Sequence, residues 1–69
     1  MESLKLQIMK AEWQGYRWAL EHPQADADAV EAACYALYPE TSAGVLLYAF
    51  ERGFAMARAG EQPAESEPA

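Results

Sequence analysis

Cys34 and His22 are the side chains best suited to nucleophilic or acid–base chemistry, and the chain has one cysteine and one histidine. A thiolate at Cys34 with His22 as its base would be a nucleophile of a common enzymatic type. No basic residue lies near Cys34 in the sequence to lower the pKa of its thiol. We therefore predict that Cys34 is a small hydrophobic residue on a helix face and that His22 stabilises a helix end.

Three carboxylates close together in the sequence, Asp26, Asp28 and Glu31, raise the question of a cation site. Calcium needs roughly six to eight oxygen ligands, and the EF-hand spacing with its central glycine is absent. Asp28 and Glu31 instead fit a capping box at the start of a helix, with Asp26 adding negative charge there. With no glycine-rich phosphate loop either, we predict no metal, no cofactor and no enzymatic activity.

The central helix of the fold is predicted over about residues 41–59. At about 100° per residue its apolar arc covers about 200°. The arc is centred on Leu46, Phe50, Gly53 and Ala57. Gly53 costs roughly 1 kcal/mol against alanine inside a helix, so we expect a neighbouring backbone or a bulky ring to approach it closely. Gly60 is expected to end the helix in a left-handed conformation.

A first helix is predicted over about residues 3–22, because Pro23 disfavours a helical residue before it. It has two opposite apolar faces. One face carries Leu6, Met9, Trp13, Tyr16 and Leu20, and the other carries Leu4, Ile8, Ala11, Gly15, Trp18 and Ala19. A single neighbour cannot cover both, so we expect one face to pack within the chain and the other against a second subunit or a target. The pattern does not indicate which face is the dimer seam.

A second, alanine-rich helix is predicted over about residues 29–38. Pro39 either ends this helix or occupies the first position of the third helix, and the sequence leaves both open. Residues 61–69 contain two prolines, three glutamates and no large apolar residue. Because such a segment cannot offset its ordering entropy, we predict a helical domain over residues 1–60 and a disordered acidic tail over residues 61–69.

The length of 69 residues bounds the stability of the fold. A single core of this size rarely supplies more than about 3 to 5 kcal/mol, and one cysteine allows no intramolecular disulfide. We therefore expect an all-α fold, either a small helical hairpin or a three-helix domain, that forms a homodimeric helical bundle. The lone cysteine and the missing signal peptide favour a cytoplasmic location, and no segment is apolar enough to span a membrane.

The net charge of −6 is partly due to the tail, which holds three of the eleven acidic residues. The remaining eight acidic and five basic residues leave −3, which is ordinary for a small domain. The sequence shows no basic patch for a phosphate backbone, so direct binding to nucleic acid is not expected.

Aromatic and arginine side chains that fall off the core faces are candidates for partner contact, because Trp, Tyr and Arg are enriched in interface hot spots. The predicted partner-binding residues are Arg17, Trp18, Tyr48 and Arg52. The residues predicted for the core or the dimer seam are Met9, Trp13, Tyr16, Leu20, Phe50 and Phe54.

A pattern of small and aromatic residues resembles ribosome modulation factor and its small relatives. The pattern is Ala11-x-x-x-Gly15-Tyr16, then Tyr38-Pro39, then Phe50-x-x-Gly53-Phe54-x-x-Ala57. The resemblance implies contact with ribosomal RNA through a basic surface, whereas this chain is acidic. A ribosome-associated protein is therefore the alternative function.

In size, acidic charge and helical architecture, the chain is also similar to small phage-encoded proteins that bind and disable a host regulator, the quorum-sensing anti-activators. This resemblance implies a target such as a LuxR-type transcription regulator or a pilus-assembly ATPase. We therefore predict a non-enzymatic protein-binding module that inhibits a bacterial cytoplasmic protein, with no direct contact with nucleic acid or membrane.

Overall fold

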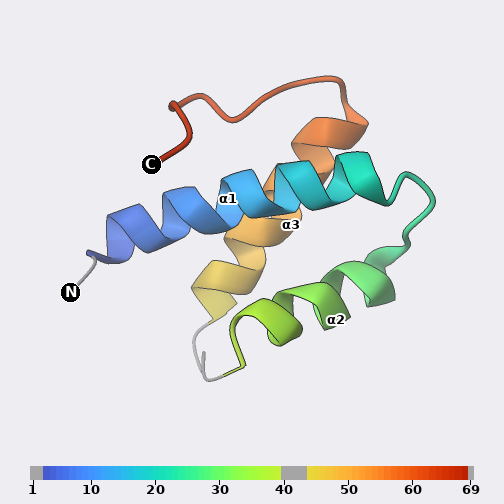
Figure 1. Cartoon of the computed structure of the whole chain (residues 1–69), viewed down its shortest axis with the longest axis horizontal. Helices are drawn as coiled ribbons and strands as arrows, with labels where there is room; N and C mark the ends of the chain where they lie inside the picture. Colours follow the sequence, from blue (N-terminus) through green and yellow to red (C-terminus); the bar gives the residue numbers. More distant parts are fainter. Residues whose placement is uncertain (1–2, 40–43, 69) are drawn as a thin grey trace.

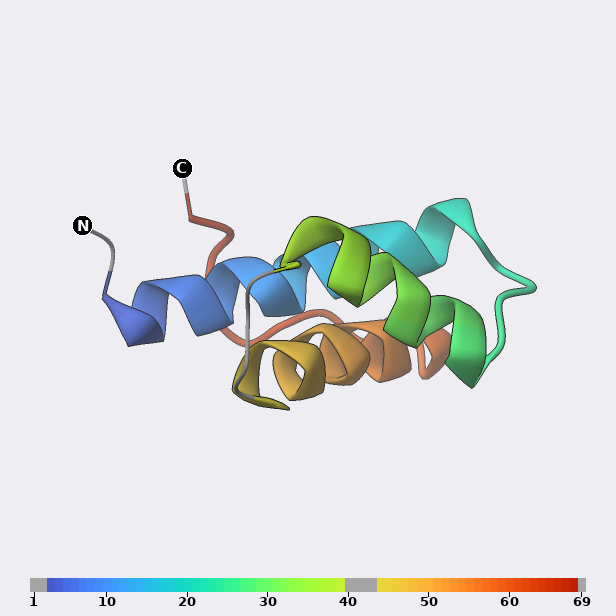
Figure 2. The ribbon, with the colours of Figure 1, turned by 90° about the horizontal axis from the view of Figure 1, so that it is seen from below.

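The computed structural model describes residues 3–39 and 44–68 of the chain. Over these residues the fold is all-α, as the sequence predicts, with three helices and no strand. Helix α1 spans Leu4–Glu21, α2 spans Ala27–Leu37 and α3 spans Gly44–Arg58. Helix α3 crosses α1 and also contacts α2 (Figures 1 and 2). No helix in these ranges is long and apolar enough to cross a membrane.

Helices α1 and α3 touch through their backbones at two glycines. A Cβ at Gly15 would collide with the backbone carbonyl of Phe50, and a Cβ at Gly53 would collide with the backbone carbonyl of Glu12. Ala11 on α1 is fully buried beside this crossing. The expectation that a neighbouring backbone approaches Gly53 is confirmed, and the low helix propensity of glycine is offset here by close interhelical packing.

The core is divided into two clusters that both contact Tyr38. One cluster consists of Ala11, Leu46 and Ala49, and the other of Val30, Cys34 and Phe50. The ring of Phe50 is fully buried between the helices. Apolar side chains from all three helices therefore meet around α3, which is the central helix that the apolar arc predicts.

The helix ends are set by local hydrogen bonds. Ser3 caps α1 by accepting from the Leu6 backbone N–H at 3.1 Å. Asp26 caps α2 by accepting from the Ala29 N–H at 2.9 Å. The capping box predicted at Asp28 is therefore wrong: because the earlier aspartate supplies the cap, α2 begins at Ala27 and Asp28 lies in its first turn.

The end of α3 has the expected left-handed glycine. Gly60 has a φ of 76°, and its N–H donates to the Ala57 carbonyl at 3.1 Å. The N–H of Glu61 donates to the Met56 carbonyl at 2.8 Å, which completes a Schellman motif. The prediction for Gly60 is confirmed.

Pro39 follows Tyr38, the C-cap residue of α2, and so lies beyond the end of that helix. Helix α3 is described from Gly44 onward. The first three residues of the helix predicted over residues 41–59 lie outside the described ranges.

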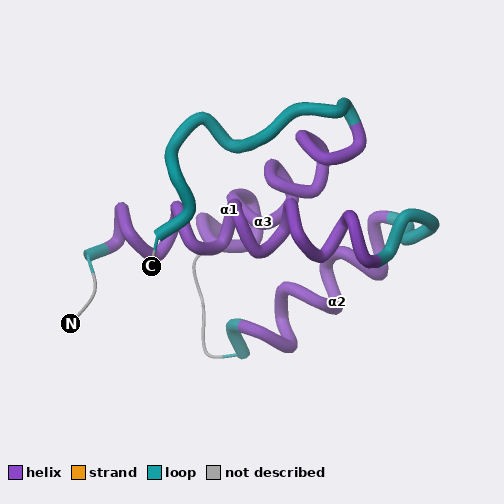
Figure 3. Tube along the Cα trace, turned by 45° about the horizontal axis from the view of Figure 1, so that its top comes forward, coloured by secondary structure: helices purple, strands orange, loops and turns teal. Residues whose placement is uncertain are grey.

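Residues 61–68, predicted from composition to belong to a disordered tail, run back along α1 in the structure (Figures 1 and 3). They have no helix or strand, and Pro63 is buried. In the structure these residues gain hydrogen bonds from Trp13 and Arg17 of α1, a helix that is already formed.

Candidate protein-interaction surface

The outer face of α1, on the side away from the helix crossing, is the surface along which the tail runs. We call it the Trp13 face. It comprises Lys5, Met9, Lys10, Trp13 and Arg17 of α1 with Arg52 of α3. This is the second apolar face of the first helix, flanked by basic side chains. The other face packs within the chain, through Ala11, Gly15 and Ala19.

Two side chains of α1 hold the tail. The indole N–H of Trp13 donates to the backbone carbonyl of Glu65 at 2.8 Å. Four residues on, the Arg17 guanidinium donates to both carboxylate oxygens of Glu67, with its Nε at 3.0 and 2.9 Å and its Nη2 also in contact. Such charge-assisted, two-point contacts fix orientation as well as adding energy.

The Trp13 ring is held in place from two sides. The Tyr16 ring meets it edge to face, with centroids 5.5 Å apart. The Arg17 guanidinium lies 6.0 Å from its centroid, at the limit of a cation–π contact. The ring is therefore positioned by its own helix, and the tail binds to a surface that α1 itself orients.

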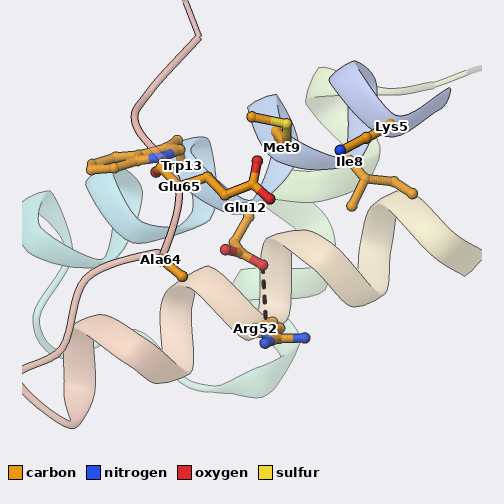
Figure 4. Close-up of a pocket in the computed structure, with 8 residues that line it drawn as sticks. All are labelled: Lys5, Ile8, Met9, Glu12, Trp13, Arg52, Ala64 and Glu65. Carbon is orange, nitrogen blue, oxygen red and sulfur yellow. Dashed lines mark hydrogen bonds and ion pairs between the residues drawn. The ribbon is translucent and has the colours of Figure 1, made fainter. Parts of the chain in front are cut away.

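Beside Trp13 lies an open cleft of about 250 Å³ between α1, α3 and the tail (Figure 4). Its lining residues are Lys5, Ile8, Met9, Glu12, Trp13, Arg52, Ala64 and Glu65. Glu12 of α1 and Arg52 of α3 form an ion pair, with 3.5 Å between Glu12 Oε2 and Arg52 Nε. Figure 4 shows the Glu65 side chain reaching across the cleft toward Met9, while Glu12 points the other way, toward Arg52.

The basic residues of this acidic protein gather on the Trp13 face. The chain has five Lys and Arg residues in all, and each lies in the described ranges. Four of them are part of the face: Lys5, Lys10, Arg17 and Arg52. The fifth, Arg58, donates to the Ala25 carbonyl and lies over the Phe54 ring. The sequence shows no basic patch because these residues are scattered along the chain and meet only in the fold.

The ion pair between Arg17 and Glu67 changes the pKa of both groups in the directions that favour their charges. The hydrogen bond from Arg17, followed by its positive charge, lowers the pKa of the Glu67 carboxyl. The same hydrogen bond and the charge of Glu67 raise the pKa of Arg17. Both side chains are exposed, at 61% for Arg17 and 39% for Glu67, so water screens the pair.

Two of the four predicted partner-binding residues, Arg17 and Arg52, lie on the Trp13 face. Trp18 does not lie on this face. The centroid of its ring is 6.0 Å from the ring centroids of both Phe50 and Phe54, and its ring stacks on that of His22 with centroids 4.3 Å apart. Tyr48 is 64% exposed on α3, one turn before Arg52 and outside the cleft lining.

The residues predicted for the core or the dimer seam also divide into two groups. Phe50 and Phe54 contribute to the internal packing around α3. Met9 and Trp13 line the cleft, Tyr16 supports the Trp13 ring, and Leu20 is 59% exposed. The α1 members of this set therefore lie outside the two core clusters.

Glu65 and Glu67 contact α1 in the structure but carry no sequence motif that marks them. Their positions two apart, in a tail of small residues, are visible in the sequence. In the fold this spacing matches that of Trp13 and Arg17, which contact residues 65 and 67 from the same side of α1. The composition of the tail does not indicate these contacts.

Cys34 and His22 are placed in different surroundings. Cys34 is buried against Val30 and Phe50, and burial, with a smaller effect of Glu51, raises the pKa of its thiol. A neutral, buried thiol is a poor nucleophile. His22 is exposed, and its Nδ1 lies 2.9 Å from the Trp18 carbonyl. Within the described residues, no group of three His, Cys, Asp or Glu side chains is arranged to hold a metal ion.

Comparison with known proteins gives no match: no family model, no curated protein and no solved structure is detectably similar to this chain. The pattern that resembles ribosome modulation factor includes Gly15 and Gly53, which meet at the helix crossing. Those two positions therefore have a packing role in this fold whatever the protein binds.

Proposed function

We propose that the protein is a non-enzymatic binding module that inhibits a bacterial cytoplasmic protein by occupying a functional surface of that protein. The observation that carries the proposal is the Trp13 face, an aromatic and basic surface covered only by an exposed tail. Trp, Met and Arg are enriched in protein interfaces, and Trp and Arg in their hot spots. The similarity in size and architecture to phage anti-activators suggests a LuxR-type transcription regulator as the target, with a pilus-assembly ATPase as a second candidate.

The exposed contacts of the tail indicate that the tail can leave the Trp13 face readily. The Arg17 to Glu67 pair is exposed to solvent, so water screens its charges and the pair adds little to the stability of the tail contact. Removing the tail would uncover the Trp13 indole and the Met9 side chain together. A partner could therefore replace the tail at little cost.

Capture from a bacterial lysate with the tagged full-length chain tests this function. We expect wild-type protein to retain one dominant regulator or ATPase, identified by mass spectrometry, through a wash at high salt. Trp13→Ala should lower that capture by about tenfold or more, because hot-spot aromatics carry much of the binding energy. Tyr35→Ala is the matched control, since Tyr35 is a half-exposed aromatic on α2 outside the Trp13 face.

Equal capture by wild type and Trp13→Ala, with helical circular dichroism spectra preserved in both, would contradict the proposal. Recovery of ribosomal proteins and RNA that is lost as salt rises would instead support the ribosome-associated alternative. We do not propose that alternative, because the Gly15 and Gly53 pattern on which it rests is accounted for by helix packing.

A further inference from the structure

The chain's own tail indicates which kind of ligand the Trp13 face accepts. We propose that the face binds a short acidic segment of a partner protein, and that residues 61–68 occupy the same face within the chain as a competitor. This inference rests on the proposed protein-binding function and specifies the chemistry of the partner. Three observations carry it: the contacts of the tail, the distribution of charge and the exposure of the contacts.

The contacts define a recognition pattern that depends on few side chains of the ligand. Trp13 binds a backbone carbonyl, which every peptide offers, and Arg17 binds the carboxylate of a residue two positions later. The bound segment has no helix or strand, and Pro63 within it is buried. A linear peptide with a proline and a correctly placed glutamate reproduces all of these features.

Charge complementarity points to an acidic ligand. Four of the five basic residues of the chain surround the face, although the whole protein has a net charge of −6. The tail uses Arg17 for Glu67, while Lys5 and Arg52 line the cleft beside Glu65. An acidic segment longer than the tail could therefore extend toward Lys5 along α1.

Because the contacts between the tail and the Trp13 face are exposed to solvent, a partner segment can take the place of the tail. A tethered tail competes at an effective concentration in the millimolar range, so a partner must bind better than the tail or the tail must be weakened. The Arg17 to Glu67 pair is the contact most easily weakened, because it lies at the surface. Loss of the Glu67 charge should therefore raise the affinity of the face for a peptide added in solution.

A peptide-exchange experiment on the full-length chain tests the inference. The probe is a fluorescein-labelled synthetic peptide with the sequence of residues 61–69, and the readout is fluorescence anisotropy. We expect Glu67→Gln protein to bind the peptide about two to five times more tightly than wild type, which corresponds to loss of one exposed ion pair. Binding should weaken in about 0.5 M salt, where screening acts within a few ångströms.

Two matched variants isolate the cause. The double variant Arg17→Ala with Glu67→Gln has the same weakened tail but lacks the cation, so it should bind the peptide less tightly than Glu67→Gln alone. Glu61→Gln removes one charge from an exposed tail position next to Gly60 and should match wild type. A peptide with its three glutamates replaced by glutamine should bind each of these proteins more weakly than the peptide with the sequence of residues 61–69.

The inference is overturned if the peptide binds neither wild type nor Glu67→Gln, or if Glu67→Gln and Glu61→Gln bind it equally well. Tighter binding of a single-stranded oligonucleotide of equal charge would also overturn it, because the face would then select phosphate. Lysate capture that depends on Trp13 without any peptide binding would leave the proposed function standing and reject only the acidic ligand.

Discussion

The two tryptophans lie in different surroundings, one under the tail and one against the rings of α3. The sequence predicts Trp13 for the core or the dimer seam and Trp18 for partner contact; in the structure Trp13 lies under the tail and Trp18 packs on Phe50 and Phe54. The two residues are five positions apart, which places them about 140° apart around α1. Which of them faces inward depends on where α2 and α3 lie, and helix periodicity holds no information about that.

The pKa shift of Glu67 predicts acid-induced release of the tail. The carboxyl pKa is lowered when the tail is bound, so the contact contributes fully above the ordinary glutamate pKa of about 4.3. It is lost as the pH falls through the lowered pKa, and no change is expected near neutral pH. Following the Trp13 indole N–H by NMR should show a transition with its midpoint below about 4.3.

The control for this titration is Glu67→Gln, in which the Trp13 signal should show no transition assigned to that carboxyl. A midpoint at or above the ordinary glutamate value would contradict the prediction, because it would mean that Arg17 does not stabilise the ionised form.

The crossing of α1 and α3 depends on Gly53. In Gly53→Ala the new methyl would meet the Glu12 backbone, which cannot rotate away as a side chain could. We expect the free energy of unfolding to fall by about 1 to 3 kcal/mol, the usual cost of overpacking, despite the gain in helix propensity. Urea unfolding followed by circular dichroism measures this change.

Gly44→Ala is the matched control for that substitution. Nothing lies within 4 Å of a Cβ at Gly44, so this variant should be as stable as wild type or slightly more stable. If Gly53→Ala were as stable as Gly44→Ala, the backbone contact at the crossing would not exist in solution.

The predicted homodimer rests on the small core and on large apolar side chains that the fold leaves exposed. These are Leu4, Leu20, Tyr35, Leu37 and Tyr48. Sedimentation equilibrium at micromolar concentration should give the mass of two chains. Leu20→Ser should shift the equilibrium toward the monomer, because Leu20 belongs to the set predicted for the core or the dimer seam and is 59% exposed.

Leu37→Ser on α2 is the comparison variant, since Leu37 is similarly exposed but outside the predicted seam. Dissociation by Leu37→Ser alone would place the seam on α2. A single-chain mass for wild type would reject the homodimer and would mean that the packing around α3 is sufficient for stability.

Features that depend on neighbours along the chain can be predicted from the amino-acid sequence. These are the three helices, the central position of the third, the end at Gly60 and the close approach at Gly53, each of which follows from periodicity or from the conformational preferences of single residues. The capping aspartate was misplaced by two residues because Asp26 and Asp28 offer similar local chemistry.

The rotation of one helix relative to another depends on how the whole chain packs. The tertiary structure turned Trp18 inward, brought Arg52 beside α1, and placed residues 61–68 along the Trp13 face. The tail has too little apolar surface to order itself, and its partners Trp13 and Arg17 are about fifty residues away in the chain. Contacts between such distant residues leave no periodic trace in the sequence, because they form only after the helices have packed.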